Sequence, residues 1–218
     1  MSEAGLAHDL ATFAEERLAG RHVVDPWGVD HGVYDLAARA GRLRWAVRVE
    51  GAEHVPAAGP ALLVVNRRFG ISEPAAVAMG VHESTGRRVR PVGVPDIPVL
   101  GAILRRLGGV LDAPAEIRGL LRAGEVVAVP CSRQPLHAEI PGVLRSASIR
   151  AALDAAAPVI PVAVTGSELG LAWRVHIGAP ARARSERGSG AEARAALMAD
   201  TVRDALAALL AAARPFDA

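Results

Sequence analysis

The chain of 218 residues is 51% hydrophobic and 22% charged, as expected for a globular protein with a sizeable core. Its net charge of +2 gives no strong electrostatic reason to expect nucleic acid, although a local basic patch stays open, and 3% of aromatic residues are too few for a base-stacking surface, so no nucleic acid partner is expected. The single cysteine, Cys131, excludes an internal disulfide and is typical of a reducing cytosol. No apolar stretch is long enough to span a membrane. We therefore expect a cytoplasmic protein with one domain over residues 1–218.

Two helices are predicted before the first strand, forming a helical lead-in over residues 1–43. Residues 2–19 place apolar side chains on one helical face, which suits either packing on the domain or contact with a bilayer surface. Asp30 is positioned to cap a second helix that runs from His31 to about Arg42.

Ionisable side chains are concentrated around the start of this second helix, but their spacing matches no known pattern of metal ligands. We assign them to capping and solvation, and expect no metal site. These residues are Asp25, Asp30, His31 and Asp35.

Short apolar runs bounded by Gly, Pro or charged residues predict buried strands, the clearest being the uncharged run ALLVV at 61–65. Further strands are predicted at 44–51, 87–94, 125–129, 158–166 and 173–177. Helices are predicted between or after them at 74–81, 97–107, 114–123, 148–157 and 191–213. This order predicts an α/β fold with a mostly parallel central sheet flanked by helices, including an N-terminal and a C-terminal helix.

Polar residues follow two of the buried strands at the points where the strands end. Sites in open α/β sheets lie at the carboxyl ends of strands, so these residues are expected to lie close together. Arginine binds phosphate through paired hydrogen bonds, although pairing of these arginines with Glu73 and Glu139 is the alternative. The candidate binding residues are Asn66, Arg67, Arg68, Cys131, Ser132 and Arg133.

The stretch 61–74, ALLVVNRRFGISEP, resembles the first motif of the glycerolipid and lysophospholipid (1-acylglycerol-3-phosphate type) acyltransferases. In that motif a buried strand is followed by Asn-His, four residues and Asp. Asn66 matches the motif, whereas Arg67 occupies the histidine position and Ser72 the aspartate position, with Glu73 beside it.

Two later segments extend the resemblance, which covers roughly residues 25–180. The segment PVIPVAVTG at 158–166 resembles the family's strand that leads into the loop closing the site. Pro130 matches the proline of the family's Phe-Pro-Glu-Gly motif, where Cys131 and Ser132 replace Glu and Gly.

The resemblance implies a reaction in which the histidine takes a proton from the acceptor hydroxyl, which then attacks an acyl thioester. Arg67 does not act as this base, because a guanidinium has no acceptor lone pair and does not deprotonate in proteins. Loss of a positioned base costs a factor of about a hundred to ten thousand. With no intact catalytic pair, Glu73 is a possible substitute base, and His82, His137 and His176 are the other candidates downstream. We expect weak or lost activity.

By resemblance, the chain binds or acylates a lysophospholipid or similar amphiphile at the inner face of the membrane. The co-substrate would be an acyl-CoA or acyl-carrier-protein thioester, with no bound cofactor. The alternative is a non-catalytic lipid- or partner-binding protein on the same fold, with Arg67 and Phe69 filling the crevice. A further hypothesis pairs Cys131 as nucleophile with His137 as base.

Overall fold

The computed structural model describes residues 3–66, 72–131, 142–166, 169–182 and 190–213. Within these ranges, six strands form one sheet with the order β1-β6-β5-β2-β4-β3. All neighbouring pairs are parallel except β5 and β6, which confirms the predicted mostly parallel α/β sheet. The strands are β1 (Ala46–Glu50), β2 (Ala61–Val65), β3 (Val89–Pro91), β4 (Val126–Pro130), β5 (Val159–Gly166) and β6 (Ala172–Ile177).

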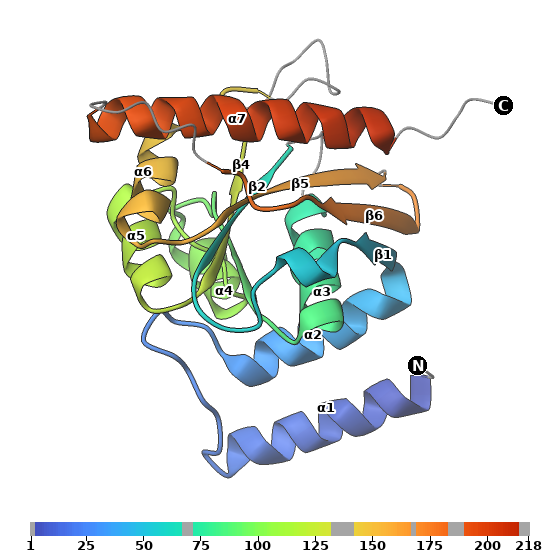
Figure 1. Cartoon of the computed structure of the whole chain (residues 1–218). Helices are drawn as coiled ribbons and strands as arrows, with labels where there is room; N and C mark the ends of the chain where they lie inside the picture. Colours follow the sequence, from blue (N-terminus) through green and yellow to red (C-terminus); the bar gives the residue numbers. More distant parts are fainter. Residues whose placement is uncertain (1–2, 67–71, 132–141, 167–168, 183–189, 214–218) are drawn as a thin grey trace, which may run out of the picture.

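Helices cover both faces of this sheet, with α7 along one face and α3 against the other (Figure 1). A short 3₁₀ turn, η1 (Ala52–His54), follows β1. The helices are α1 (Glu3–Leu18), α2 (His31–Arg44), α3 (Glu73–Thr85), α4 (Pro98–Arg106), α5 (Pro114–Arg122), α6 (Ser146–Asp154) and α7 (Ala191–Ala212).

The predicted elements exist, and their boundaries differ by a few residues. The helix predicted at 74–81 continues as α3 to Thr85, where Gly86 adopts the left-handed conformation that ends it. The strand predicted at 87–94 is shorter, because β3 covers only Val89–Pro91. All five residues of β2 are buried, as the uncharged run predicts for a central strand covered on both faces.

The loop before α2 uses its carboxylates to fix the backbone. Asp30 Oδ1 accepts a hydrogen bond from the backbone N–H of Val33 at 3.1 Å, which confirms the predicted cap. Asp25 Oδ1 accepts the backbone N–H groups of Trp27 and Val29 at 2.9 and 3.0 Å. These contacts agree with the assignment of the acidic residues to capping.

A buried ion-pair network, which sequence patterns do not reveal, attaches this loop to the sheet. Arg90 lies on β3 with its side chain only 3% exposed. Its guanidinium donates to Asp25 and, from Nε at 3.1 Å, to Glu125 Oε2. Burial acts to lower the pKa of Arg90, but the hydrogen bonds and charges of the two carboxylates outweigh it, so the pKa is raised.

The N-terminal helix α1 lies outside the sheet layers and packs on α2 (Figure 1). Arg17 forms an ion pair with the buried Asp30, and the Phe13 ring lies against Gly32. Leu10 and Leu18 remain exposed. None of the helices in the described ranges is long and apolar enough to cross a membrane.

We expect acid to destabilise the fold through Asp25 and Asp30. Burial acts to raise the pKa of both carboxyls, but hydrogen bonds from backbone N–H groups and the nearby arginines outweigh it, so both values lie below 3.8. The unfolded chain therefore binds more protons in this range, and unfolding free energy falls as the pH drops below about 5. Urea unfolding at pH 7, 5, 4 and 3 measures this loss.

The Asp25→Asn variant should show a flatter dependence of unfolding free energy on pH than the wild type. Asp204→Asn, at an exposed position on α7, is the matched control and should leave the slope unchanged. An Asp25→Asn slope equal to that of the wild type would contradict the assignment.

Candidate functional site

The carboxyl ends of β2, β4 and β5 meet at one edge of the sheet, where the sequence predicts a site. Asn66 follows β2 and is only 2% exposed. Its amide Nδ2 donates to the Val164 carbonyl at 3.0 Å, and its Oδ1 accepts the Val164 N–H at 2.6 Å. Asn66 thus joins β2 to β5 as an additional backbone unit would, and its amide is occupied by this contact.

Cys131 follows β4 at the same edge, and its backbone N–H donates to the Val65 carbonyl at 2.8 Å. Its side chain belongs to the core on the α7 side of the sheet and is fully buried. Burial raises the pKa of the thiol to about 11, with Glu73 adding to the shift and Arg203 opposing it. Because the thiolate is the reactive form, this environment disfavours Cys131 as a nucleophile.

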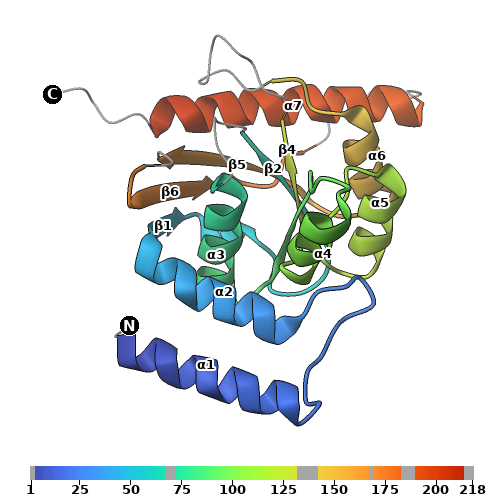
Figure 2. The same ribbon diagram turned by 180° about the vertical axis from the view of Figure 1, so that it is seen from behind.

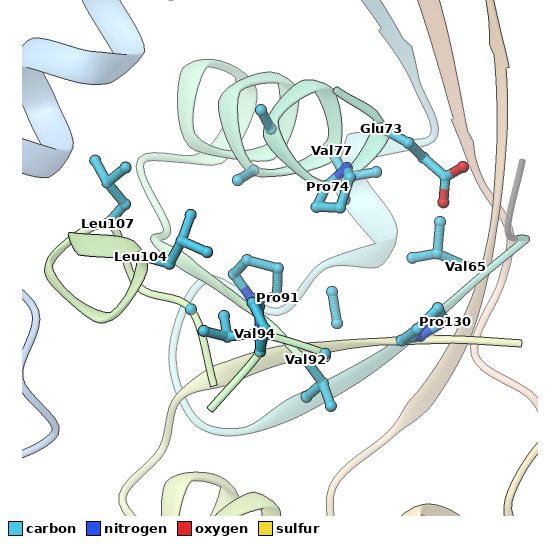
Figure 3. A pocket seen from close by; sticks show the side chains of 16 residues that line it. Val65, Glu73, Pro74, Val77, Pro91, Val92, Val94, Leu104, Leu107 and Pro130 are labelled. Atoms are coloured by element: carbon cyan, nitrogen blue, oxygen red, sulfur yellow. The ribbon is translucent and has the colours of Figure 1, made fainter. Parts of the chain in front are cut away.

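An apolar pocket of about 310 Å³ lies on the other face of the sheet, between α3, α4 and the ends of β2, β3 and β4 (Figure 3). The lining residues are Val65, Glu73, Pro74, Ala75, Val77, Ala78, Pro91, Val92, Gly93, Val94, Pro95, Leu104, Leu107, Gly109, Ala128 and Pro130. Apart from Glu73, every side chain in this lining is apolar, so the pocket suits a hydrocarbon chain.

Glu73 is the one ionisable side chain among the described residues that line the pocket. It begins α3 and is only 5% exposed, and its carboxylate lies beside Val65 at one end of the apolar space (Figure 3). The start of a helix stabilises negative charge, because its first N–H groups carry a partial positive charge. The pocket therefore has an apolar body and a single acidic end.

The pocket opens where its lining reaches the surface, at Pro74, Gly93 and Pro95, all of which are exposed. The wall at Gly109 is close-packed. A Cβ atom added to Gly109 would lie 2.2 Å from Val94 Cγ2, so glycine is needed for this approach of the chain to the segment after β3. The pocket is thus an open cleft with one tight wall.

No histidine is found among the described residues that line the pocket. His82 lies in the last turn of α3, about 13 Å along the helix from Glu73. Its Nε2 lies 3.6 Å from Asp35 Oδ1 and its ring packs edge-on against Tyr34. His176, on β6, places Nδ1 3.1 Å from Glu50. Both imidazoles therefore serve contacts away from the pocket.

The remaining predicted site residues are only partly covered by the structure. Ser72 lies directly before α3, half-buried, and its carbonyl accepts the Ala76 N–H at 2.9 Å. The predicted residues that fall outside the described ranges are Arg67, Arg68, Phe69, Ser132, Arg133, His137 and Glu139. The phosphate-binding role of the arginines and the pairing of Cys131 with His137 remain predictions.

Sequence reasoning missed the wall of the pocket formed after β3 and by α4. The available signal was the segment Pro-Val-Gly-Val-Pro at 91–95, where apolar residues alternate with residues that interrupt a strand. A Gly and two Pro residues after a buried strand indicate a turn at the carboxyl edge of the sheet. That they line a cavity depends on how α3 and α4, which flank them in sequence, pack around them, and no local pattern specifies this packing.

The fold is similar to that of a solved acyltransferase. The crystal structure of the 1-acyl-sn-glycerophosphate (LPA) acyltransferase, PlsC, from Thermotoga maritima matches with a TM-score of 0.55. The match covers 84% of this chain and 79% of that protein, at 20% sequence identity. At this identity the likeness shows the fold alone, and it confirms the acyltransferase-like architecture predicted from the sequence.

The sequence relatives carry no assigned activity. Uncharacterized proteins of Mycobacterium tuberculosis and Mycobacterium bovis are 29% identical over 184 residues, which is 76% of this chain and 51% of theirs. An uncharacterized protein of Mycobacterium leprae is 29% identical over 178 residues, 73% of this chain and 48% of its own length. The chain spans about half the length of the curated relatives it matches. No family model matches it.

Proposed function

We propose that this chain binds a single-chain amphiphile, either a lysophospholipid or an acyl thioester, with its hydrocarbon chain in the apolar pocket. One observation carries the proposal: the pocket lies at the carboxyl ends of β2 and β4, is apolar throughout its body, and has a single acidic end at Glu73. The acyltransferase-like fold supports the choice of ligand class.

The apolar body of the pocket suits the hydrocarbon part of such a ligand. Each buried methylene of the hydrocarbon chain contributes about 0.8 kcal/mol, so several of them supply useful affinity without polar contacts. The volume of about 310 Å³ lies near the lower end of the range typical of small-molecule sites, which favours one chain over two. In this proposal the head group lies near Glu73, and Arg67 and Arg68, which follow Asn66 in sequence, bind its phosphate.

Acyl transfer at this site is proposed to be weak or lost. Transfer requires a base to take the acceptor's hydroxyl proton while the oxygen attacks the thioester carbonyl and the carbon–sulfur bond breaks, releasing a thiol. Arg67 lacks the lone pair for this step. Glu73 is the carboxylate placed beside the pocket, so any residual transfer would depend on it.

Binding and transfer are separated by two measurements on the same protein. Titration with lysophosphatidic acid below its micelle concentration, and with a medium-chain acyl-CoA, should give saturable binding to at least one ligand. A thiol-release assay with both should show slow turnover or none, with any turnover lost in Glu73→Gln but binding retained. Absence of binding to both ligands would overturn the proposal. Rapid turnover that survives Arg67→Ala but not Glu73→Ala would overturn its non-catalytic part.

A further inference from the structure

Helix α4 exposes large apolar side chains on its outer face. Single exposed hydrophobic residues are ordinary, whereas a contiguous group on one element marks an interaction surface. We call this group the α4 ridge. It consists of Ile97, Val99, Leu100 and Ile103, which are 51%, 73%, 46% and 54% exposed.

The spacing of the ridge residues places them side by side. Val99 and Leu100 lie four and three residues before Ile103, so these three side chains share one side of α4. Ile97 directly precedes the first residue of the helix. No charged residue interrupts the stretch 98–104. Viewed from behind, α4 lies at the front of the molecule with no other helix drawn over it (Figure 2).

The α4 ridge is continuous with the mouth of the pocket. Pro95, an exposed residue of the mouth, has its carbonyl hydrogen-bonded by the Ile97 N–H at 2.9 Å. On the inner side, Leu104 of the same helix and Leu107, which directly follows it, line the pocket. One short helix thus presents apolar side chains both to the surface and to the cavity, beside the opening that connects them.

Cationic side chains stand at the carboxyl end of α4. Arg106 is 49% exposed and Arg105 34% exposed, so their guanidinium groups reach solvent although each has a carboxylate partner, Asp30 and Glu116 respectively. Arginines beside an apolar helix face can extend their charged ends to lipid phosphates while the stems lie along the hydrocarbon. The exposed Asp96 at the other end opposes this attraction.

The dimensions of the α4 ridge favour a bilayer over a second protein as its partner. The helix has nine residues, so it is about 13 Å long and about 10 Å wide. A stable protein interface buries about 800 Å² on each partner, several times the area of one such face. Insertion of an apolar helix face into lipid needs no matching surface of that size.

We propose that the α4 ridge docks on an anionic lipid bilayer and thereby turns the mouth of the pocket toward the membrane. An amphiphile chain then passes from lipid into the pocket along a continuous apolar path. This inference rests on the proposed function for the identity of the ligand. It assigns the membrane contact to α4, whereas the sequence raises such a contact only as an alternative for the N-terminal helix.

Co-sedimentation with vesicles of phosphatidylcholine and phosphatidylglycerol tests the proposal. The double variant Val99→Asp/Ile103→Asp should bind these vesicles at least tenfold more weakly than the wild type. The matched control adds the same two charges elsewhere, as Leu18→Asp/Leu169→Asp on α1 and before β6, at positions 90% and 94% exposed, and should bind as the wild type does. Equal binding by Val99→Asp/Ile103→Asp and the wild type, or an equal loss in the control, would overturn the proposal.

Two further measurements separate this inference from its alternatives. Binding of monomeric lysophosphatidic acid reports on the pocket alone and should be unchanged in the double variant, which also shows that the variant is folded. If the wild type binds vesicles but neither monomeric lysophosphatidic acid nor a medium-chain acyl-CoA, the result supports the α4 ridge and contradicts the proposed function. Monomer binding without vesicle binding contradicts only the assignment of the α4 ridge to the membrane. A dimer, detected by light scattering and abolished in the double variant, would overturn the choice of a bilayer.

Discussion

Replacement of Arg90 by Met is expected to lower the free energy of unfolding by about 3–5 kcal/mol, because removal of one partner leaves buried charges uncompensated. Arg90 holds two carboxylates, Asp25 and Glu125, whose side chains are 12% and 29% exposed. Without the guanidinium these like charges face each other with little water. Their partial exposure places the expected loss nearer to about 3 kcal/mol. Urea unfolding at pH 7 measures it.

Arg150→Met is the matched control for this prediction. Arg150 also pairs with a carboxylate, Glu192, at 3.0 Å, but both side chains are largely exposed at 46% and 69%. Exposed pairs of this kind contribute about 0–1 kcal/mol. Equal losses in the two variants would show that the buried network does not hold the Asp25 loop to the sheet.

Ala78→Trp is expected to weaken binding of the proposed ligand more than about a hundredfold. Ala78 lies on α3, and its side chain lines the pocket, so an indole at this position occupies the space of the hydrocarbon chain. Displacement of about four methylene groups from the pocket costs about 3 kcal/mol of binding free energy. Titration with lysophosphatidic acid below its micelle concentration measures the change.

The control for this substitution is Ala196→Trp, on the exposed side of α7. It adds the same indole away from the pocket and should leave binding unchanged. Circular dichroism and the melting temperature show whether Ala78→Trp retains its fold. Wild-type affinity in a folded Ala78→Trp variant would mean that the ligand chain lies elsewhere.

The elements of the fold could be predicted where local patterns decide them. The uncharged run at 61–65 is short and follows Gly-Pro, which favours a strand covered on both faces, and Asp30 has the side chain and position of a helix cap. The outer face of α4 shows that such patterns do not decide whether an apolar face is buried or exposed. Apolar side chains at helical spacing predict an apolar face, but not whether that face packs on the core or contacts solvent.

The site could be predicted only in its location. Strand ends in an α/β sheet identify the edge where Asn66 and Cys131 lie, and the structure brings them there. The direction of each side chain is set by neighbours distant in sequence. The side-chain amide of Asn66 is hydrogen-bonded to the backbone of Val164, and Cys131 is buried in the core on the α7 side of the sheet. The pocket itself needs segments from β3, α3 and α4 to meet, which no local pattern specifies.

Burial of Cys131, the only cysteine of the chain, has a practical consequence for spectroscopy. Maleimide and methanethiosulfonate reagents attack thiolates, and Cys131 is both inaccessible and protonated at neutral pH. A cysteine introduced at an exposed position such as Val99 or Leu18 would therefore react selectively with a spin label or fluorophore, while Cys131 stays in place and unlabelled. Such probes would report how deeply α4 and α1 enter a bilayer, and Cys131, a core residue, would not have to be replaced first.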